Sequence, residues 1–339
     1  MQYEVELADG LRLARAMVPR GRADREVPFP TRWISTVTGR AAMVHALSLL
    51  RKRGVLADRN APILVPQWLC TSFLQLVQKH ASPTLSLAVE PKVAVVYHQY
   101  GFPQDMDEVL DYADRKKITV IEDCANLYEG YYKGRRLGTF GWAAIFSLGK
   151  VFPSIWGGGL ATADEELYVH ACKQQGELDA PLVTYALYAT KYVADRSRRR
   201  PSSWVSLATQ MAYAVGERAQ RNPRFSTRIA VDEIASNALG RRARNYRLLL
   251  ERFSTRGHFD GLEAEGVYPY VAPFFGPEDV LRRVAASLSQ GGFESGVYHF
   301  DVNRNVFRPR FVKCAWVPVH QGLTLADMHA VGDLIERAL

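Results

Sequence analysis

The chain has 339 residues, of which 47% are hydrophobic and 23% are charged, and its formal net charge is +8. This balance is typical of a soluble globular protein with room for one large α/β domain and a smaller one. No run of about eighteen apolar residues occurs and the first thirty residues lack a signal-peptide core, so we expect a cytoplasmic protein without a membrane span.

Neither the cysteines nor the positive charge indicates a metal or a nucleic acid. The cysteines are scattered without the paired spacing of a zinc site, at Cys70, Cys124, Cys172 and Cys314. We expect no metal site and free thiols in a reducing compartment, two of them buried beside apolar runs. The basic run at residues 196–200 is typical of a solvated helix end, and no RNA- or DNA-binding signature surrounds it. We therefore expect no nucleic-acid partner.

The first part of the chain predicts a helix whose N-terminus could hold a phosphate. Residues 1–30 show no regular pattern and are expected to form an N-terminal arm. Thr38 and Gly39 open a segment in which apolar residues recur on one helical face, at Ala41, Val44, Leu47 and Leu50. Unpaired N–H groups and the positive end of the dipole at a helix start suit a phosphate. Residues 63–66 are then predicted to form a strand, followed by the loop 67–72.

Two apolar runs flank the next predicted helix. Residues 93–97 have the composition of a buried strand and end at His98, which we interpret as a structural residue rather than a catalyst. Asp105 and Glu108 form a capping box at a helix start. Residues 118–121 form the second run, so the segment predicts a β-α-β unit.

A carboxylate and a lysine follow neighbouring predicted strands. Asp123 comes just after the run 118–121, and Lys150 follows the run 143–146. A triple glycine, 157–159, precedes a third short apolar run, and such runs are typical of buried parallel strands. Because ligands bind at the carboxyl ends of parallel strands, we expect Asp123 and Lys150 to share one crevice. A lysine amine forms a Schiff base with a carbonyl, and pyridoxal phosphate (PLP) needs an acid on its pyridinium nitrogen.

The remainder of the chain predicts a second domain. A mostly helical, polar stretch is followed by predicted strands at residues 267–275 and 311–317. A helix between them ends at Gly291, and Thr324 and Asp327 cap the last helix.

An ordered series of motifs connects these features. Glu-Asp-Cys-Ala-Asn, Lys-Gly, Gly-Thr-Phe-Gly, Phe-Ser, a lysine and Gly-Gly occupy residues 122–126, 133–134, 138–141, 146–147, 150 and 158–159. The series resembles the DegT/DnrJ/StrS family of PLP-dependent sugar aminotransferases. The closing segment 318–324, Pro-Val-His-x-x-Leu-Thr, is similar to the same family, and the resemblance spans residues 33–339.

The resemblance implies the α/β fold of PLP-dependent transferases of fold type I. We expect a large PLP-binding domain at residues 31–245, with a mostly parallel sheet sandwiched by helices. A smaller C-terminal α+β domain would take residues 246–339, and the arm residues 1–30.

The resemblance also implies roles at the ring of the cofactor. Asp123 would pair with the pyridine nitrogen, Lys150 would form the Schiff base and shuttle protons, and Asn126 would stand beside the ring hydroxyl in place of glutamine or histidine. Ser147 would donate to the phosphate. Ser147 and Lys150 are closer than in most members, but residues 146–153 fit a shorter Phe-Ser-x-x-Lys-x-x-Pro form.

Further cofactor contacts follow from the same register. Thr38, Gly39 and Arg40 stand where the family holds the PLP phosphate, with Arg40 in place of a threonine. Cys70 takes the position of an aromatic residue that stacks on the ring, whereas Trp68 is the nearest aromatic, and the two alternatives stay open. Ser226 replaces an asparagine that reaches the phosphate of the partner subunit, which implies a homodimer with shared active sites.

The function that follows is amination of a keto-sugar, expected to be nucleotide-linked, with glutamate as amino donor and pyridoxamine phosphate as intermediate. The segment between residues 82 and 93 is shorter than in the family, so substrate contacts do not carry over. One alternative is a PLP-dependent sugar dehydratase, which Lys150 disfavours because a histidine replaces the lysine there. The other is a non-catalytic or regulatory member that keeps the fold.

Overall fold

The computed structural model describes residues 27–154, 157–175, 211, 217, 224–262 and 265–339. Almost all of the predicted N-terminal arm, up to residue 26, and the basic run 196–200 lie outside the described residues. Among the described helices, none has both the length and the apolar character that crossing a membrane requires.

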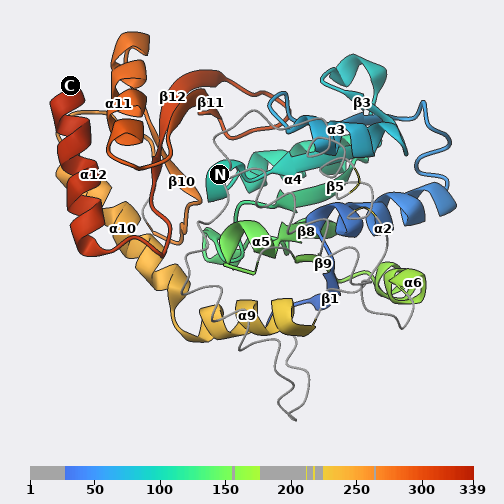
Figure 1. Cartoon of the computed structure of the whole chain (residues 1–339). Coiled ribbons are helices and arrows are strands. Elements are labelled where there is room, and N and C mark those ends of the chain that lie inside the picture. The colour runs from blue at the N-terminus through green and yellow to red at the C-terminus, as the bar shows by residue number, and fades with distance from the viewer. Residues whose placement is uncertain (1–26, 155–156, 176–210, 212–216, 218–223, 263–264) are drawn as a thin grey trace.

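A seven-stranded sheet forms the centre of the larger part of the molecule, in the order β1-β9-β8-β5-β4-β2-β3 (Figure 1). Its strands are β1 (Arg32–Thr36), β2 (Pro62–Leu64), β3 (Ser82–Thr84), β4 (Val93–Tyr97), β5 (Thr119–Cys124), β8 (Ala143–Ser147) and β9 (Gly158–Thr162). The five strands from β3 to β8 in this order run parallel. The predicted α/β fold with a mostly parallel sheet is confirmed.

The strand after the triple glycine does not run as predicted. β9 pairs antiparallel with β8, with Ser147 opposite Gly158, and β1 pairs antiparallel with β9. A parallel partner would require a crossover of about a dozen residues or more, usually with a full helix. The connection from β8 to β9 is too short for that, so the chain turns back. The short helix α5 (Leu148–Val151), which carries Lys150, begins this connection.

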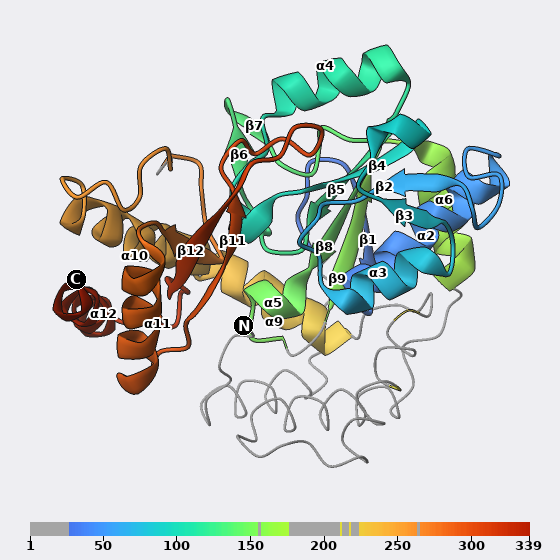
Figure 2. The same cartoon turned by 90° about the horizontal axis from the view of Figure 1, so that it is seen from above.

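Helices cover both faces of the sheet, as Figure 2 shows. Val93 and Val95 of β4 share one core with the helices on one face, whereas Ala94 and Val96 share another with the helix on the opposite face. Because successive residues of a strand point to opposite faces, β4 is apolar along its length. The helices of the first face are α2 (Gly39–Lys52), α3 (Thr71–Gln78) and α6 (Glu165–Gln175), and that of the second is α4 (Met106–Lys116).

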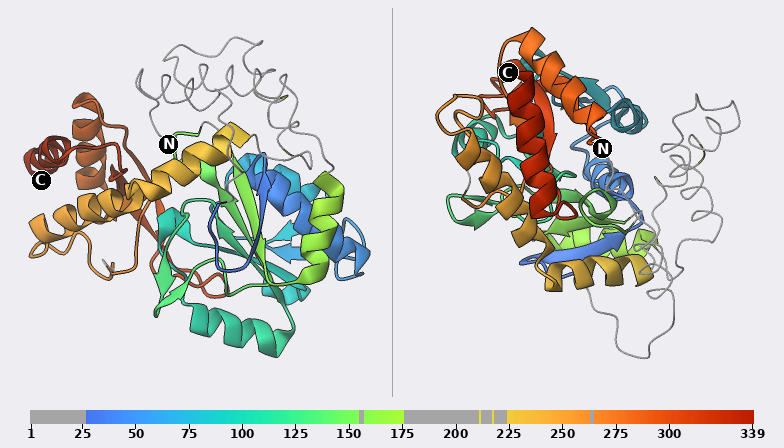
Figure 3. Two further views of the ribbon diagram at one scale, coloured as in Figure 1. Left: turned by 90° about the horizontal axis from the view of Figure 1, so that it is seen from below. Right: turned by 60° about the vertical axis from the view of Figure 1, so that its left-hand side comes forward.

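The C-terminal part has a three-stranded antiparallel sheet in the order β10-β12-β11. Helices α9 and α10 lead to it from the large sheet (Figure 3). The predicted division between residues 245 and 246 falls within α10, and Tyr246 packs in the C-terminal core; this division stays a prediction. The elements are α9 (Arg224–Ala235), α10 (Ala238–Arg252), β10 (Val271–Phe274), α11 (Glu278–Gln290), β11 (Gly296–Asp301), β12 (Phe311–Pro318) and α12 (Leu325–Ala338).

Several local predictions are confirmed, one of them in part. One half of the predicted capping box at α4 forms, since the side chain of Asp105 accepts a hydrogen bond from Glu108 N at 3.2 Å. The other half does not, because Asp105 N donates to the Arg304 carbonyl oxygen and the Glu108 carboxylate accepts from Asn305 Nδ2. Thr324 and Asp327 form a reciprocal capping box at the start of α12. All four cysteines are free, two of them buried (Cys124, Cys314) and two exposed (Cys70, Cys172). Short elements complete the described chain: η1 (Leu87–Val89), η2 (Gln99–Gly101), β6 (Tyr131–Tyr132) and β7 (Arg135–Arg136).

Candidate active site

The structure brings Asp123 and Lys150 into one site at the carboxyl ends of β5 and β8. Asp123 is 3% exposed, and its Oδ1 accepts a hydrogen bond from Ala125 N at 2.9 Å. Burial raises the pKa of Asp123, and the positive charge of Lys150 acts in the opposite direction. With one N–H donor at Oδ1, the Asp123 carboxylate can accept a further hydrogen bond from one strong donor.

The neighbouring acid, Glu122, has a structural role. It is fully buried, and its two oxygens accept hydrogen bonds at 2.7 to 3.1 Å from four N–H groups, those of Gly138, Phe140, Gly141 and His98. His98 Nδ1 accepts a hydrogen bond from Gln104 N at 3.2 Å, so the ring hydrogen is on Nε2 and points to Glu122. This arrangement agrees with the interpretation of His98 as a structural residue.

These buried groups also have the spacing of a metal site. Ligand atoms of His98, Glu122 and Cys124 lie within 4.8 Å of one another. However, both oxygens of Glu122 already accept N–H hydrogen bonds. Burial raises the pKa of the Cys124 thiol well above its ordinary value, which disfavours the thiolate that a metal needs. Hydrogen bonding accounts for the cluster without a metal.

Lys150 is positioned by residues far away in the sequence. Its short helix α5 ends at Val151, whose carbonyl oxygen accepts hydrogen bonds from Arg242 Nη2 at 3.1 Å and Gln321 Nε2 at 2.7 Å. Arg242 also donates to Gln321 Oε1 at 2.6 and 3.0 Å, and both side chains are buried. The sequence did not predict this support. In the sequence, Gln321 is marked only by its place within the closing motif, at a position where the motif specifies no residue type.

The N-terminus of α2 lies directly against the start of β9. A Cβ atom on Gly158 would come within 2.2 Å of the Thr38 carbonyl carbon, and one on Gly39 within 2.8 Å of the Phe146 carbonyl oxygen and 3.6 Å of Ser147 Cβ. Thr38 caps the helix by accepting a hydrogen bond from Ala41 N at 3.1 Å. The first N–H groups of α2 and the Ser147 side chain therefore converge.

Arg40 lies in the first turn of α2 and is half-buried. Its position on this turn is compatible with the predicted phosphate contact, because the first turn of a helix is where anions bind.

Asn126 is held by Tyr97, the last residue of β4. The Tyr97 hydroxyl donates a hydrogen bond to Asn126 Oδ1. Burial first, and the negative charge of Asp123 second, raise the pKa of Tyr97 well above its ordinary value, so the phenol keeps its hydrogen. With Oδ1 engaged, the amide Nδ2 of Asn126 is the group left to donate. The only sequence signal for Tyr97 is its place at the end of a predicted strand.

The two candidates for the ring-stacking position lie in different surroundings. Trp68 stacks on His299 of β11, with ring centroids 4.2 Å apart and planes at 3°. Cys70 is the N-terminal cap residue of α3, is exposed, and lies close enough to Tyr97 to influence its pKa. Both residues therefore lie near Tyr97, but the ring of Trp68 is already engaged by His299.

Ser226 lies on α9 and is fully buried within its own chain. Its hydroxyl is therefore not on the surface of the chain, whereas the predicted contact with a partner subunit requires a surface position. The cross-subunit role of Ser226 stays a prediction.

Taken together, these groups fit PLP. A buried carboxylate suits a pyridinium N–H, a lysine amine near it suits the aldehyde, and a helix N-terminus beside a serine suits the phosphate. The cradle formed at Gly39 and Gly158 has no room for a Cβ atom, so its backbone approaches closely, as a phosphate site requires.

The sequence is similar to those of known aminotransferases. A model of the DegT/DnrJ/EryC1/StrS aminotransferase family matches residues 81–177. A Micromonospora echinospora protein, named for amino transfer between L-glutamine and 3-amino-2,3-dideoxy-scyllo-inosose, is 30% identical over 283 residues, which cover 72% of this chain and 63% of that protein. GDP-perosamine synthase of Escherichia coli O157:H7 is 35% identical over 88 residues, 25% of this chain and 24% of that enzyme. The matches thus span less than two thirds of these relatives' lengths.

The fold is shared over a greater length. The crystal structure of a DegT DnrJ EryC1 StrS aminotransferase from Brucella abortus superposes with a TM-score of 0.65 at 15% identity, over 99% of both chains. At this identity the likeness shows the fold, and it confirms the predicted fold class.

Proposed function

We propose that the chain is a member of the DegT/DnrJ/EryC1/StrS aminotransferase family, whose model matches residues 81–177. In this proposal it transfers an amino group to a keto-sugar through PLP, as the name of its Micromonospora echinospora relative suggests. The observation that carries the proposal is the meeting of Asp123 with Lys150 beside a glycine-lined helix N-terminus. PLP, when bound, supplies a ring that accepts electrons from a substrate carbon.

Different residues of the chain would hold the cofactor and transfer protons. Asp123 would accept a hydrogen bond from the pyridine N–H and so keep a proton on that nitrogen. Lys150 Nζ would hold the cofactor through its aldehyde and then move protons between substrate atoms. The side chain of Asn126 would donate from Nδ2 to the ring hydroxyl. The burial of Asp123 excludes water and so strengthens these interactions.

The phosphate would be held at the start of α2. The backbone of Gly39 and Arg40, the Thr38 segment and the Ser147 hydroxyl supply neutral donors at the positive end of a helix dipole. Because these donors are fixed by the packing of α2 on β9, they would lose little entropy on binding. We propose that Cys70 packs its thiol against the face of the cofactor ring, where an aromatic residue would stack.

The amino donor and acceptor are proposed from chemistry and from the relatives' names. Glutamate was the predicted donor, and one relative is named for L-glutamine; both present the same α-amino acid group. The relatives' names include a keto-cyclitol and a GDP-linked sugar. We propose a hydroxylated cyclic ketone as acceptor, either sugar or cyclitol, with or without a nucleotide, and a homodimer as the working form.

Replacement of Lys150 tests the proposal. Lys150→Ala should abolish turnover and remove the absorbance band of PLP bound to the protein, because no other group in the proposed site carries the required amine. Absorption spectra of the PLP-loaded protein with L-glutamate, with L-glutamine and without donor give the measurement. Lys116→Ala, on the exposed surface of α4, is the matched control and should behave like the wild type.

Each outcome decides between the alternatives. Normal turnover in Lys150→Ala contradicts the proposal. A wild-type protein that forms no band with PLP supports a non-catalytic member. A band that neither donor shifts contradicts amino transfer from these two amino acids.

A further inference from the structure

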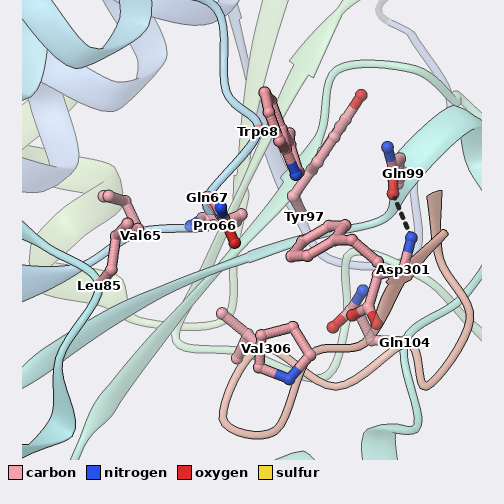
Figure 4. A pocket seen from close by; sticks show the side chains of 12 residues that line it. Val65, Pro66, Gln67, Trp68, Leu85, Tyr97, Gln99, Gln104, Asp301 and Val306 are labelled. Carbon is pink, nitrogen blue, oxygen red and sulfur yellow. Dashed lines mark hydrogen bonds between the residues drawn. The ribbon is translucent and has the colours of Figure 1, made fainter. Parts of the chain in front are cut away.

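A pocket adjoins the candidate active site and is lined by both parts of the chain. Its walls include Trp68 from the loop after β2, Tyr97 from the end of β4, Gln104 before α4, and Asp301 and Phe311 from the β11–β12 region (Figure 4). The cavity volume is about 90 Å³, which is room for about six waters at roughly 15 Å³ each by this measure. The pocket can therefore take a ring-sized group.

Tyr97 separates this pocket from the candidate active site. Its side chain lines the pocket, and its hydroxyl bonds to Asn126 on the other side. The two sites are thus one side chain apart. The opposite rim is open, because Leu85, which also lines the pocket, is 61% exposed. Leu85 lies between β3 and η1, in the segment that is shorter than in the family.

Two buried polar atoms in the pocket walls have no hydrogen-bond partner within the part of the chain that the structure describes. They are Trp68 Nε1 and Gln104 Oε1. Gln104 is only 4% exposed. Trp68 is held by its stacking on His299. A buried polar atom without a partner carries an uncompensated desolvation cost, so the pocket favours an occupant with both a donor and an acceptor.

The walls disfavour a negatively charged occupant. Among the described residues that line the pocket, none carries a positive charge, and Asp301 is an acid. A phosphate group would therefore find no cation there. The rings of Trp68, Tyr97 and Phe311 offer apolar faces on which the C–H groups of a saturated ring can pack. A hydroxyl group both donates and accepts, which matches the two unsatisfied wall atoms.

We infer that this pocket binds the neutral, polyhydroxylated ring of the amino acceptor. One ring hydroxyl donates to Gln104 Oε1, and another accepts from Trp68 Nε1. A nucleotide, where the acceptor carries one, lies outside this pocket. The inference rests on the proposed amino transfer for the identity of the ring, but the pocket is a separate set of residues from the cofactor contacts.

Binding of scyllo-inosose, a neutral keto-cyclitol, to the PLP-loaded full chain tests this inference by isothermal titration calorimetry. Gln104→Leu keeps a branched side chain of comparable volume but removes the acceptor, and Trp68→Phe keeps an aromatic ring but removes the donor. Each should weaken binding about tenfold, the effect of one buried hydrogen bond of about 1.4 kcal/mol. Gln75→Leu, exposed on α3 and outside the pocket, is the control and should bind like the wild type.

The measurements distinguish a failure of the pocket inference from a failure of the proposed amino transfer. If the wild type does not bind scyllo-inosose, or if both pocket variants bind it as tightly as the wild type, the pocket inference is overturned and water fills the pocket. The donor half-reaction is measured in the same variants by the PLP absorbance change with L-glutamate and L-glutamine. Its absence in the wild type, with ring binding that depends on Gln104, removes the proposed transamination and leaves a ring-binding pocket. A loss of the half-reaction in Gln104→Leu alone also overturns the inference, because the effect would then be on the cofactor site.

Discussion

At the scale of single residues, the adjacent acids Glu122 and Asp123 have opposite functions because a strand alternates its faces. Glu122 points to one side and receives four N–H hydrogen bonds, which satisfy its charge completely. Asp123 points to the other side, toward Lys150, and has one N–H donor. A carboxylate that is buried but incompletely satisfied is the kind that binds a ligand.

Substitution of Tyr97 tests the candidate site through cofactor binding rather than through turnover. Tyr97→Phe removes the hydroxyl that holds Asn126 Oδ1, so the amide can turn and its donor is no longer fixed toward the cofactor. We expect the dissociation constant for PLP to rise roughly fivefold, the effect of one hydrogen bond of about 1 kcal/mol, measured by equilibrium dialysis. The pH at which the bound PLP absorbance titrates should also shift.

Tyr112→Phe is the control for that experiment, because Tyr112 packs its ring on Phe307, away from the site. It should bind PLP as the wild type does. Wild-type affinity and an unchanged titration in Tyr97→Phe would show that Tyr97 does not position Asn126.

At the scale of elements, the contact between α2 and β9 shapes the proposed phosphate site. Gly158 allows the backbone of Thr38 and Gly39 to approach where any Cβ atom would collide with it. Both contacting groups are main chain, so neither can turn aside as a side chain could. The antiparallel return of β9 after β8 makes this contact possible, since it places Gly158 opposite Ser147.

Gly158→Ala should therefore move the start of α2 away from β8. The new Cβ atom would lie 2.2 Å from the Thr38 carbonyl carbon, and overpacking of this kind costs about 1–3 kcal/mol. We expect a lower unfolding free energy in urea and at least about tenfold weaker PLP binding, since misplaced donors lose roughly a kcal/mol or more each. In the control Gly276→Ala, the nearest atoms to the new Cβ are 3.8 Å away; equal behaviour of the two variants would refute the role given to Gly158.

At the scale of the whole molecule, the C-terminal part supports the helix that carries Lys150. Gln321, just before α12, and Arg242, on α10, both donate to the Val151 carbonyl oxygen. Asn245 on the same helix donates to the carbonyl oxygens of His320 and Leu323 at 3.0 and 3.1 Å. The closing segment thus connects the second core to the candidate active site through a continuous set of hydrogen bonds.

His320, in the same closing segment, makes the free energy of unfolding depend on pH. Burial first, and the charge of Arg242 second, lower the pKa of His320 from 6.5 to about 4. The unfolded chain therefore binds a proton between pH 6.5 and 4 that the folded chain does not. The resulting stability is fully present above pH 6.5 and is lost as the pH falls toward 4. At about 1.4 kcal/mol per pH unit, the loss between pH 7.5 and 4.5 is about 2–3 kcal/mol.

Urea unfolding at pH 7.5 and 4.5 measures this loss in the wild type and in His320→Asn. The asparagine can replace the acceptor Nδ1, which receives a hydrogen bond from Gly322 N at 3.2 Å, but it does not titrate. The variant should lose less stability on acidification than the wild type by about 2–3 kcal/mol. An equal loss in both proteins would assign the pH dependence to other groups.

Local and periodic information in the sequence determined much of this protein. The buried strands β4, β5 and β8 follow from short apolar runs, because a strand covered on both faces needs apolar residues at every position. The capping residues Asp105 and Thr324 act on N–H groups three residues away, so sequence spacing alone specifies them. The proximity of Asp123 and Lys150 followed from the rule that parallel strands share one edge for ligands.

Tertiary structure alone decided the supporting contacts. The hydrogen bond from Gln321 to Val151 joins residues 170 positions apart, and that from Arg242 to Gln321 spans 79. The pocket joins the loop at Trp68 to Phe311. No periodicity or spacing records such pairs, because they form only when the C-terminal part packs against the large sheet. The direction of β9 and the restraint of Asn126 by Tyr97 likewise depend on the packed chain. For this reason the sequence predicted the residues of the candidate site but not the groups that hold them in place.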